Sequence, residues 1–130
     1  MDLLSDDRLA GEIAPILLGY SPAAGDAARR LFRRHRVISH VLCARVPFLR
    51  RFSLTMKFHP VRGFDREELV LTALEDFADG SCNPDAILYL IPATRRAAAL
   101  IRDNRERLET RYVIASPEEL RRLFRAPRKE

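Results

Sequence analysis

The stretch PILLGYSPAAGDAARRLFRRHR, residues 15–36, decides the fold of this chain. It opens with a continuous apolar run from Pro15 to Gly19, which is typical of a strand buried on both faces of a parallel sheet. Ser21 then precedes Pro22, as an N-cap residue precedes a proline at the first helical position. Apolar residues follow at helical spacing on one face and arginines on the other, as far as about Arg36. The stretch therefore predicts the opening strand, turn and helix of a parallel α/β sheet.

Further strands and helices are predicted downstream from apolar runs and capping residues. Residues 45–53 carry several arginines and Pro47, so we expect a loop there that crosses the sheet edge. The predicted strands cover residues 37–44, 54–60, 87–91 and 111–115. The predicted helices cover residues 65–80, 94–108 and 116–124, and each begins with a capping residue. Asp65 forms a D-x-x-E capping box with Glu68, and Ser116 forms a capping box with Glu119. Thr94 caps the middle helix alone.

This order of elements predicts the topology. Right-handed crossovers wind the order β-α-β-β-α-β-α-β-α into an α/β fold with a three-layer parallel sheet. We expect a Rossmann-like arrangement of about five strands in the order 3-2-1-4-5. The turns that follow Gly19 and Pro92 should then face one another between strands 1 and 4, where ligands bind in open α/β sheets.

The length and composition fit one globular domain. Of the 130 residues, 47% are hydrophobic and 32% are charged, which argues against global disorder. We expect a lead segment over residues 1–13, partly helical, a single domain over 14–126, and a loose tail over 127–130. No signal-peptide pattern opens the chain, and the longest apolar runs are too short to cross a bilayer. The expectation is a cytoplasmic protein with no membrane contact.

The net charge of +5 is carried almost wholly by arginine, because Lys57 and Lys129 are the only lysines. Such a balance permits a nucleic-acid partner. Acidic residues are interspersed among the arginines, however, as in the segment RDNRER, residues 102–107. We therefore expect no nucleic-acid partner and keep a basic nucleic-acid-binding module only as an alternative.

The common nucleotide and nucleophile motifs are missing. GYSPAAG has only the first glycine of a G-x-G-x-x-G fingerprint, because Ser21 and Ala24 take the other two positions. No P-loop occurs, and no serine stands in a G-x-S-x-G elbow. We expect no catalytic residue and no cofactor bound by this chain alone.

The three histidines also give no metal motif. His40 and Cys43 have a ligand-like spacing, but three residues apart on a strand they lie on opposite faces. His35 is expected to pack at an edge, and His59 to be a strand-end residue before Pro60. The sequence predicts no metal site.

The candidate site lies in the two facing turns. Helix N-termini attract anions, and Arg95 opens a helix where the helix dipole favours acidic residues. An anionic ligand is one interpretation; a connecting turn capped by Ser21, with solvated arginines, is the other. The candidate ligand-binding residues are Gly19, Tyr20, Ser21, Ala23, Thr94 and Arg95.

Four segments together resemble one family, the amino-terminal Rossmann-like domain that precedes the ATP-binding module in ATP-grasp carboxylate-amine ligases and carbamoyl-phosphate-synthase-like proteins. The segments are PILLGYSPAAGDAARRLF, Ser53 after a basic loop, AILYLIPATRRAAALIRDNRERL and RYVIASPEEL. The marks within them are Gly19 at the end of the first strand, Ala28 with Arg29, Ile91 with Pro92, and the run Asn104, Arg105, Glu106.

The resemblance implies a function that this chain performs only in part. Family members often carry Asp and Asn in the first turn and an acidic residue after the Ile-Pro turn, where this chain has Ser21, Ala23 and Arg95. The chain ends where the ATP-grasp module would begin, so the lysines and Mg²⁺-binding acidic residues of that module are expected on a partner. The resemblance thus implies a noncatalytic domain that binds a small carboxylate or amino-acid-like ligand, or docks on an ATP-grasp polypeptide. A substrate-positioning fragment of a split ligase is the alternative, and a homodimer is compatible with either.

Overall fold

The computed structural model describes residues 13–46, 53–80 and 85–124. Most of the expected lead segment, the centre of the expected loop over 45–53, Cys82 and the tail over 127–130 lie outside the described residues. The elements are β1 (Ile13–Leu18), α1 (Pro22–His35), β2 (Ser39–Cys43), β3 (Met56–Pro60), α2 (Glu67–Asp79), β4 (Ile87–Pro92), α3 (Arg95–Asp103), α4 (Arg105–Glu109), β5 (Val113–Ile114) and α5 (Pro117–Phe124).

The five strands form one all-parallel sheet in the order β3-β2-β1-β4-β5, which confirms the predicted topology. In the register, Leu17 of β1 lies between Val41 of β2 and Ile91 of β4. Side chains that alternate along each strand therefore pack into two separate hydrophobic cores, one on each face. The chain is a three-layer α/β domain of Rossmann-like type.

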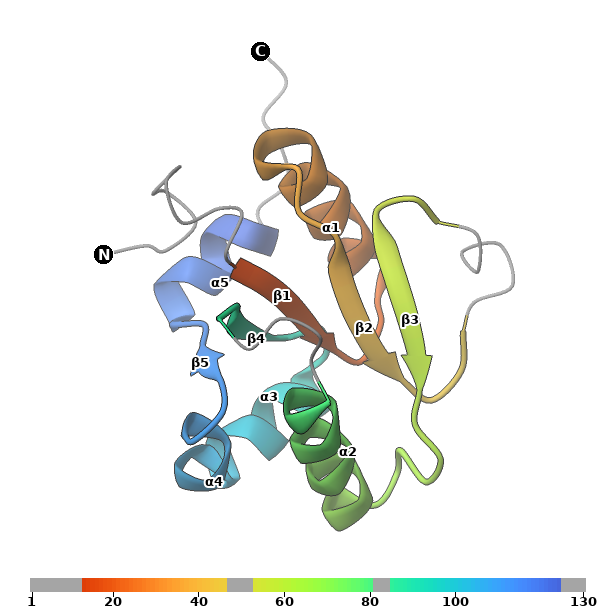
Figure 1. Ribbon diagram of the computed structural model, residues 1–130, viewed down its shortest axis with the longest axis vertical. Coiled ribbons are helices and arrows are strands. Elements are labelled where there is room, and N and C mark those ends of the chain that lie inside the picture. The colour runs from red at the N-terminus through yellow and green to blue at the C-terminus, as the bar shows by residue number, and fades with distance from the viewer. Residues whose placement is uncertain (1–12, 47–52, 81–84, 125–130) are drawn as a thin grey trace.

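The helices divide between the two faces as the crossovers require. Leu31 of α1 and Leu120 of α5 pack with Leu17 and Tyr89 on one face. Helices α2, α3 and α4 cover the other, where Leu74 belongs to the same core as the strand residues Ile16 and Leu90. Figure 1 shows α1 and α5 on one side of the sheet and the other three helices opposite.

Capping explains why several helices begin where they do. The Ser21 hydroxyl accepts the N–H of Ala24 at 3.1 Å, and helix α1 has a proline in its first turn, as predicted. At α5, the N–H of Glu119 donates to the Ser116 hydroxyl at 3.1 Å, and the N–H of Ser116 donates to the Glu119 carboxylate at 3.0 Å. This reciprocal pair is the predicted capping box.

The predicted box at Asp65 and Glu68 is wrong. The N-cap of α2 is Arg66, which makes no side-chain capping hydrogen bond. A turn in which the N–H of Arg66 donates to Gly63 at 2.9 Å precedes the helix, and the helical ladder begins at the Arg66 carbonyl. Asp65 therefore lies one residue too early to cap α2.

Three other boundaries differ from the prediction. Strand β1 begins at Ile13, which was expected in the lead segment; it is 3% exposed and pairs with Ile87. The predicted helix over 94–108 breaks at Asn104, whose side-chain amide donates to the Leu100 carbonyl at 2.8 Å. The last strand keeps only two residues, because the N–H of Tyr112 still donates to the carbonyl of Leu108 at 2.9 Å.

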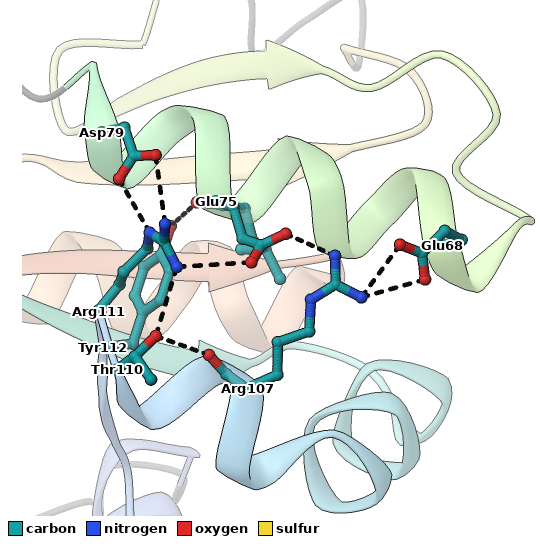
Figure 2. Close-up of polar contacts among 8 residues, drawn as sticks. Glu68, Glu75, Asp79, Arg107, Thr110, Arg111 and Tyr112 are labelled. Carbon is teal, nitrogen blue, oxygen red and sulfur yellow. Dashed lines mark hydrogen bonds and ion pairs between the residues drawn. The ribbon is translucent and has the colours of Figure 1, made fainter.

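Two arginines tie the α4–β5 segment to α2. Arg107 pairs with Glu68 at 3.0 Å and with Glu75 at 2.5 Å, while Arg111 pairs with Glu75 at 3.4 Å and with Asp79 at 2.8 Å. Figure 2 shows both guanidinium groups facing the carboxylates along one side of α2. The hydrogen bond from Arg107 lowers the pKa of Glu75, and that from Arg111 lowers the pKa of Asp79. This part of the arginine content has a structural role.

Candidate functional site

The turns after β1 and β4 are neighbours at the carboxyl edge of the sheet, as the topology predicts. The N–H of Ala93 donates to the Leu18 carbonyl at 2.9 Å, which joins the two strand ends. Gly19 has a φ of 87°, and a Cβ atom there would lie 3.2 Å from Cγ2 and 3.3 Å from Oγ1 of Thr94. The structure therefore brings Gly19 and Thr94 together, and only the lack of a side chain at Gly19 permits the approach.

Helices α1 and α3 both start at this junction and leave on opposite faces (Figure 1). Ser21 caps α1, and Thr94 caps α3 by accepting the N–H of Ala97 at 3.1 Å. Each hydroxyl thus accepts a capping hydrogen bond from its own helix.

In the first turns of α1 and α3, the N–H groups of Ala24 and Ala97 donate to the capping hydroxyls. The N–H groups of Ala23, Arg95 and Arg96 have no protein partner among the described residues. N–H groups at a helix N-terminus point outward along the helix axis. The junction therefore offers backbone donors from two helices.

The charge at the junction is positive. Neither first turn contains an acidic residue, so the positive ends of both helix dipoles are uncompensated by their own side chains. The Arg96 guanidinium donates to the Asp65 carbonyl, whereas the exposed Arg95 side chain has no partner among the described residues. Negative groups are favoured here.

The side chain of Tyr20 is not part of the junction. Its ring meets the ring of Phe58 edge-on, with centroids 5.6 Å apart. Phe58 lies on β3, two strands from β1 on the side away from β4. The Tyr20 hydroxyl lies over Gly25, and a Cβ atom at Gly25 would be 3.0 Å from it. Of the six predicted residues, Tyr20 therefore contributes its backbone position alone, and the exposed Ala23 contributes a short side chain and its N–H.

The two hydroxyls at the junction are engaged in helix capping. Neither the Ser21 nor the Thr94 hydroxyl contacts a histidine or a carboxylate within the part of the chain that the structure describes, so neither has an activating base. The thiol of Cys43, at the end of β2, donates to the Arg45 carbonyl at 3.2 Å, and burial raises its pKa. A thiol in that state is a poor nucleophile.

A second cluster, which the sequence did not predict, lies between β2, β3 and α2. Nδ1 of His40 is 3.0 Å from Nε2 of His59, and both rings contact Phe77 with centroids 5.3 and 5.0 Å away. Cys43 packs in the core on the α1 side, so it and His40 face opposite sides of the sheet as predicted. His59 was expected only as a strand-end residue; its pairing with Leu42 puts it on the face of His40, and no local pattern reveals that register.

Both imidazoles of this pair are held neutral near pH 7. Burial, His59 and Lys57 lower the pKa of His40 to about 4, and burial and Lys57 lower the pKa of His59. Within the described residues, no group of three or more histidine, cysteine, aspartate or glutamate side chains is arranged to hold a metal ion.

Fold and junction together define the class: a Rossmann-like α/β domain with a basic, backbone-lined switch point between its two halves. Comparison with protein-family models, with curated proteins and with solved structures finds no match. None of the described helices is long and apolar enough to cross a membrane.

Proposed function

We propose that this protein is a noncatalytic domain that binds a small carboxylate or amino-acid-like ligand at the junction of the β1 and β4 turns. One observation carries the proposal: two helices begin side by side where the strand order reverses, and the backbone N–H groups of Ala23, Arg95 and Arg96 in their first turns have no partner among the described residues. A carboxylate matches this chemistry, because it accepts several hydrogen bonds and gains from both helix dipoles.

The size of the ligand follows from the residues around these donors. Ala23 is exposed and has a short side chain, so a compact group can reach its N–H directly. The Arg95 side chain is available for a second negative group of the same ligand. A dicarboxylate or an acidic amino acid therefore fits better than a single small anion.

The resemblance to the pre-ATP-grasp domain supplies a partner for this proposal. In that arrangement the domain docks on a separate ATP-grasp polypeptide, which contributes ATP, Mg²⁺ and the phosphoryl-transfer residues. The junction would then form the substrate side of a shared site. A nucleic-acid role gains no support, because many of the arginines are engaged within the fold; Arg29, Arg105, Arg107 and Arg111 all pair with carboxylates.

Titration of ¹⁵N-labelled protein with sodium L-glutamate, and separately with sodium phosphate, tests the proposal by amide chemical shifts. We expect saturable shifts at Ala23, Arg95 and Arg96, larger with glutamate than with phosphate. Shifts confined to the arginine face of α1, or none that saturate, would contradict the proposal.

Two substitutions at Arg95 separate the charge from the backbone donor. Arg95→Gln removes the guanidinium alone, whereas Arg95→Pro also removes the N–H. Proline is tolerated at a first helical position, and Thr94 already has the extended backbone, φ −138° and ψ 164°, that a residue before proline prefers. We expect glutamate binding to weaken with Arg95→Gln and to weaken further with Arg95→Pro. Arg102→Gln, at the other end of α3, is the matched control and should bind as the natural protein does.

A further inference from the structure

Exposed arginines extend along the carboxyl edge of the sheet, beyond the β1–β4 junction. Arg45 lies two residues after the end of β2, Arg62 lies two residues after the end of β3, and Arg66 is the N-cap of α2. Together with Arg95, the first residue of α3, they form what we call the arginine edge. All four side chains are exposed, and none has a partner among the described residues.

Hydrogen bonds join the segments that carry these arginines. The N–H of Gly19, in the turn after β1, donates to the Leu42 carbonyl of β2 at 2.7 Å, and the N–H of Val61, after β3, donates to the last carbonyl of β2 at 2.8 Å. The Arg96 guanidinium donates to the Asp65 carbonyl and so ties the segment before α2 to the start of α3. The arginine edge is therefore continuous with the junction.

The fold itself does not account for these positive charges. Arg66 and Arg95 stand at helix N-termini, where the helix dipole disfavours positive charge. Arg33 and Arg34 are also exposed and unpartnered among the described residues, but they lie in the last turn of α1, where positive charge is favoured. Arginines such as Arg107 pair with carboxylates of the chain. A negatively charged ligand explains the arginine edge better than the stability of the domain does.

We propose that the arginine edge binds an acidic peptide, which has one acidic residue at the β1–β4 junction and further carboxylates at Arg45 and Arg62. The inference rests on the proposed function, because that first residue is the acidic ligand placed at the junction. Guanidinium groups match carboxylates in shape as well as charge, since two parallel N–H groups can donate to the two oxygens.

The width of the sheet sets the length of the peptide. Strands β1 and β2 lie between β4 and β3, so three strand spacings separate the junction side of the edge from Arg62. At about 4.8 Å per spacing this distance is about 14 Å, and an extended peptide covers it with about four residues at roughly 3.3 Å each. A tetrapeptide is therefore the shortest peptide that meets the whole arginine edge.

The aromatic residues near this edge argue for a peptide and against a nucleic acid. Proteins that bind single-stranded nucleic acid combine basic groups with aromatic rings on which the bases stack. Here the Tyr20 ring packs against Phe58, and Phe64 packs against the core on the α2 side. The described part of the edge thus offers guanidinium groups without a free ring for stacking.

Titrations of ¹⁵N-labelled protein with L-glutamate and with tetra-L-glutamate, at equal ionic strength, test the inference. We expect both ligands to shift the amides of Ala23 and Arg95, and tetraglutamate alone to shift those of Arg45 and Arg62 as well. Two further exposed ion pairs at about two- to five-fold each should make tetraglutamate bind about ten-fold more tightly than glutamate.

Substitutions of single arginines separate local contacts from net charge. Arg45→Gln and Arg62→Gln should each weaken tetraglutamate binding about two- to five-fold and reduce its advantage over glutamate. Arg34→Gln removes the same charge from the opposite end of α1 and is the matched control. It should preserve the full ratio between the two affinities.

The outcomes distinguish this inference from the proposed function. Tetraglutamate that binds no more tightly than glutamate, or leaves Arg45 and Arg62 unmoved, would overturn the inference, while glutamate shifts at Ala23 would still support the proposed function. Shifts at Arg45 and Arg62 with Ala23 unmoved by either ligand would contradict the proposed function alone.

Two further results would also overturn the peptide site. An equal loss of tetraglutamate affinity in Arg34→Gln would show that net charge governs binding. Tighter binding of tripolyphosphate or of a short oligothymidylate at the same ionic strength would show that the arginine edge prefers phosphate to carboxylate. The spectra of the natural protein decide between peptide and phosphate without any variant.

Discussion

Replacing Gly19 with alanine should destabilise the domain, because two features of the structure oppose a side chain there. The φ of 87° lies in the left-handed region, where a residue with a Cβ loses about 1–2 kcal/mol. The new Cβ would also lie 3.2 Å from Cγ2 of Thr94. Thr94 cannot move away freely, because its hydroxyl caps α3, and losing a cap costs about 1 kcal/mol. We expect the free energy of unfolding to fall by about 2–3 kcal/mol from these two contributions.

Urea denaturation followed by far-ultraviolet circular dichroism measures this loss, and it is well suited to a chain without tryptophan. The double variant with Thr94→Ala separates the contributions. With Cγ2 and Oγ1 absent, Gly19→Ala should retain only the backbone loss of about 1–2 kcal/mol. A change below about 0.5 kcal/mol for Gly19→Ala, which is the usual range for neutral surface substitutions, would refute the reasoning.

A helical glycine provides the control for this experiment. Gly25 lies inside α1, where alanine is favoured by about 1 kcal/mol, but its new Cβ would be 3.0 Å from the Tyr20 hydroxyl. In a Tyr20→Phe background that contact is removed. Gly25→Ala should then stabilise the protein, so the two glycines should respond with opposite signs.

Two further predictions concern the contacts between α2 and the α4–β5 segment. In the folded protein the pKa of Glu75 lies below its ordinary value of 4.5, and that of Asp79 lies below 3.8. The unfolded chain therefore binds more protons than the folded one in acid. The contribution of these carboxylates to the free energy of unfolding is complete above about pH 4.5 and is lost as the pH falls through the lowered folded-state values. Urea midpoints measured from about pH 3 to pH 7 should show this decline, and Glu75→Gln should make it shallower; an unchanged slope would contradict the assignment. Tyr112→Phe removes a buried hydrogen bond of 2.6 Å from the phenol to the Leu74 carbonyl of α2 and should lower the free energy of unfolding by about 0.5–1.5 kcal/mol in the same assay. No loss there would mean that the phenol makes an equally good contact in the unfolded chain.

The topology could be predicted from the sequence because its signals are local. Ser21, Thr94 and Ser116 cap their own helices by accepting an N–H three residues further along the chain, and the buried strands carry continuous apolar runs. The failed box at Asp65 shows the limit of such signals. The pattern D-x-x-E was present, but the turn closed by Gly63 and Arg66 moved the helix start by one residue.

The sequence indicates the β1–β4 junction better than it indicates the pair of His40 and His59, because the two features are built from different kinds of atom. The junction is made largely of backbone N–H groups, so its place follows from strand order, yet almost any residue could stand at Ala23 without removing its donor. The histidine pair is made of side chains, but it depends on the register between β2 and β3, and a shift of one residue would place His59 on the opposite face. The backbone donors of the junction therefore survive most substitutions other than proline, whereas the contact between the two histidines depends on the register. This contrast is why Arg95→Pro is the informative substitution at the junction: it removes a backbone donor, the kind of atom from which that site is built.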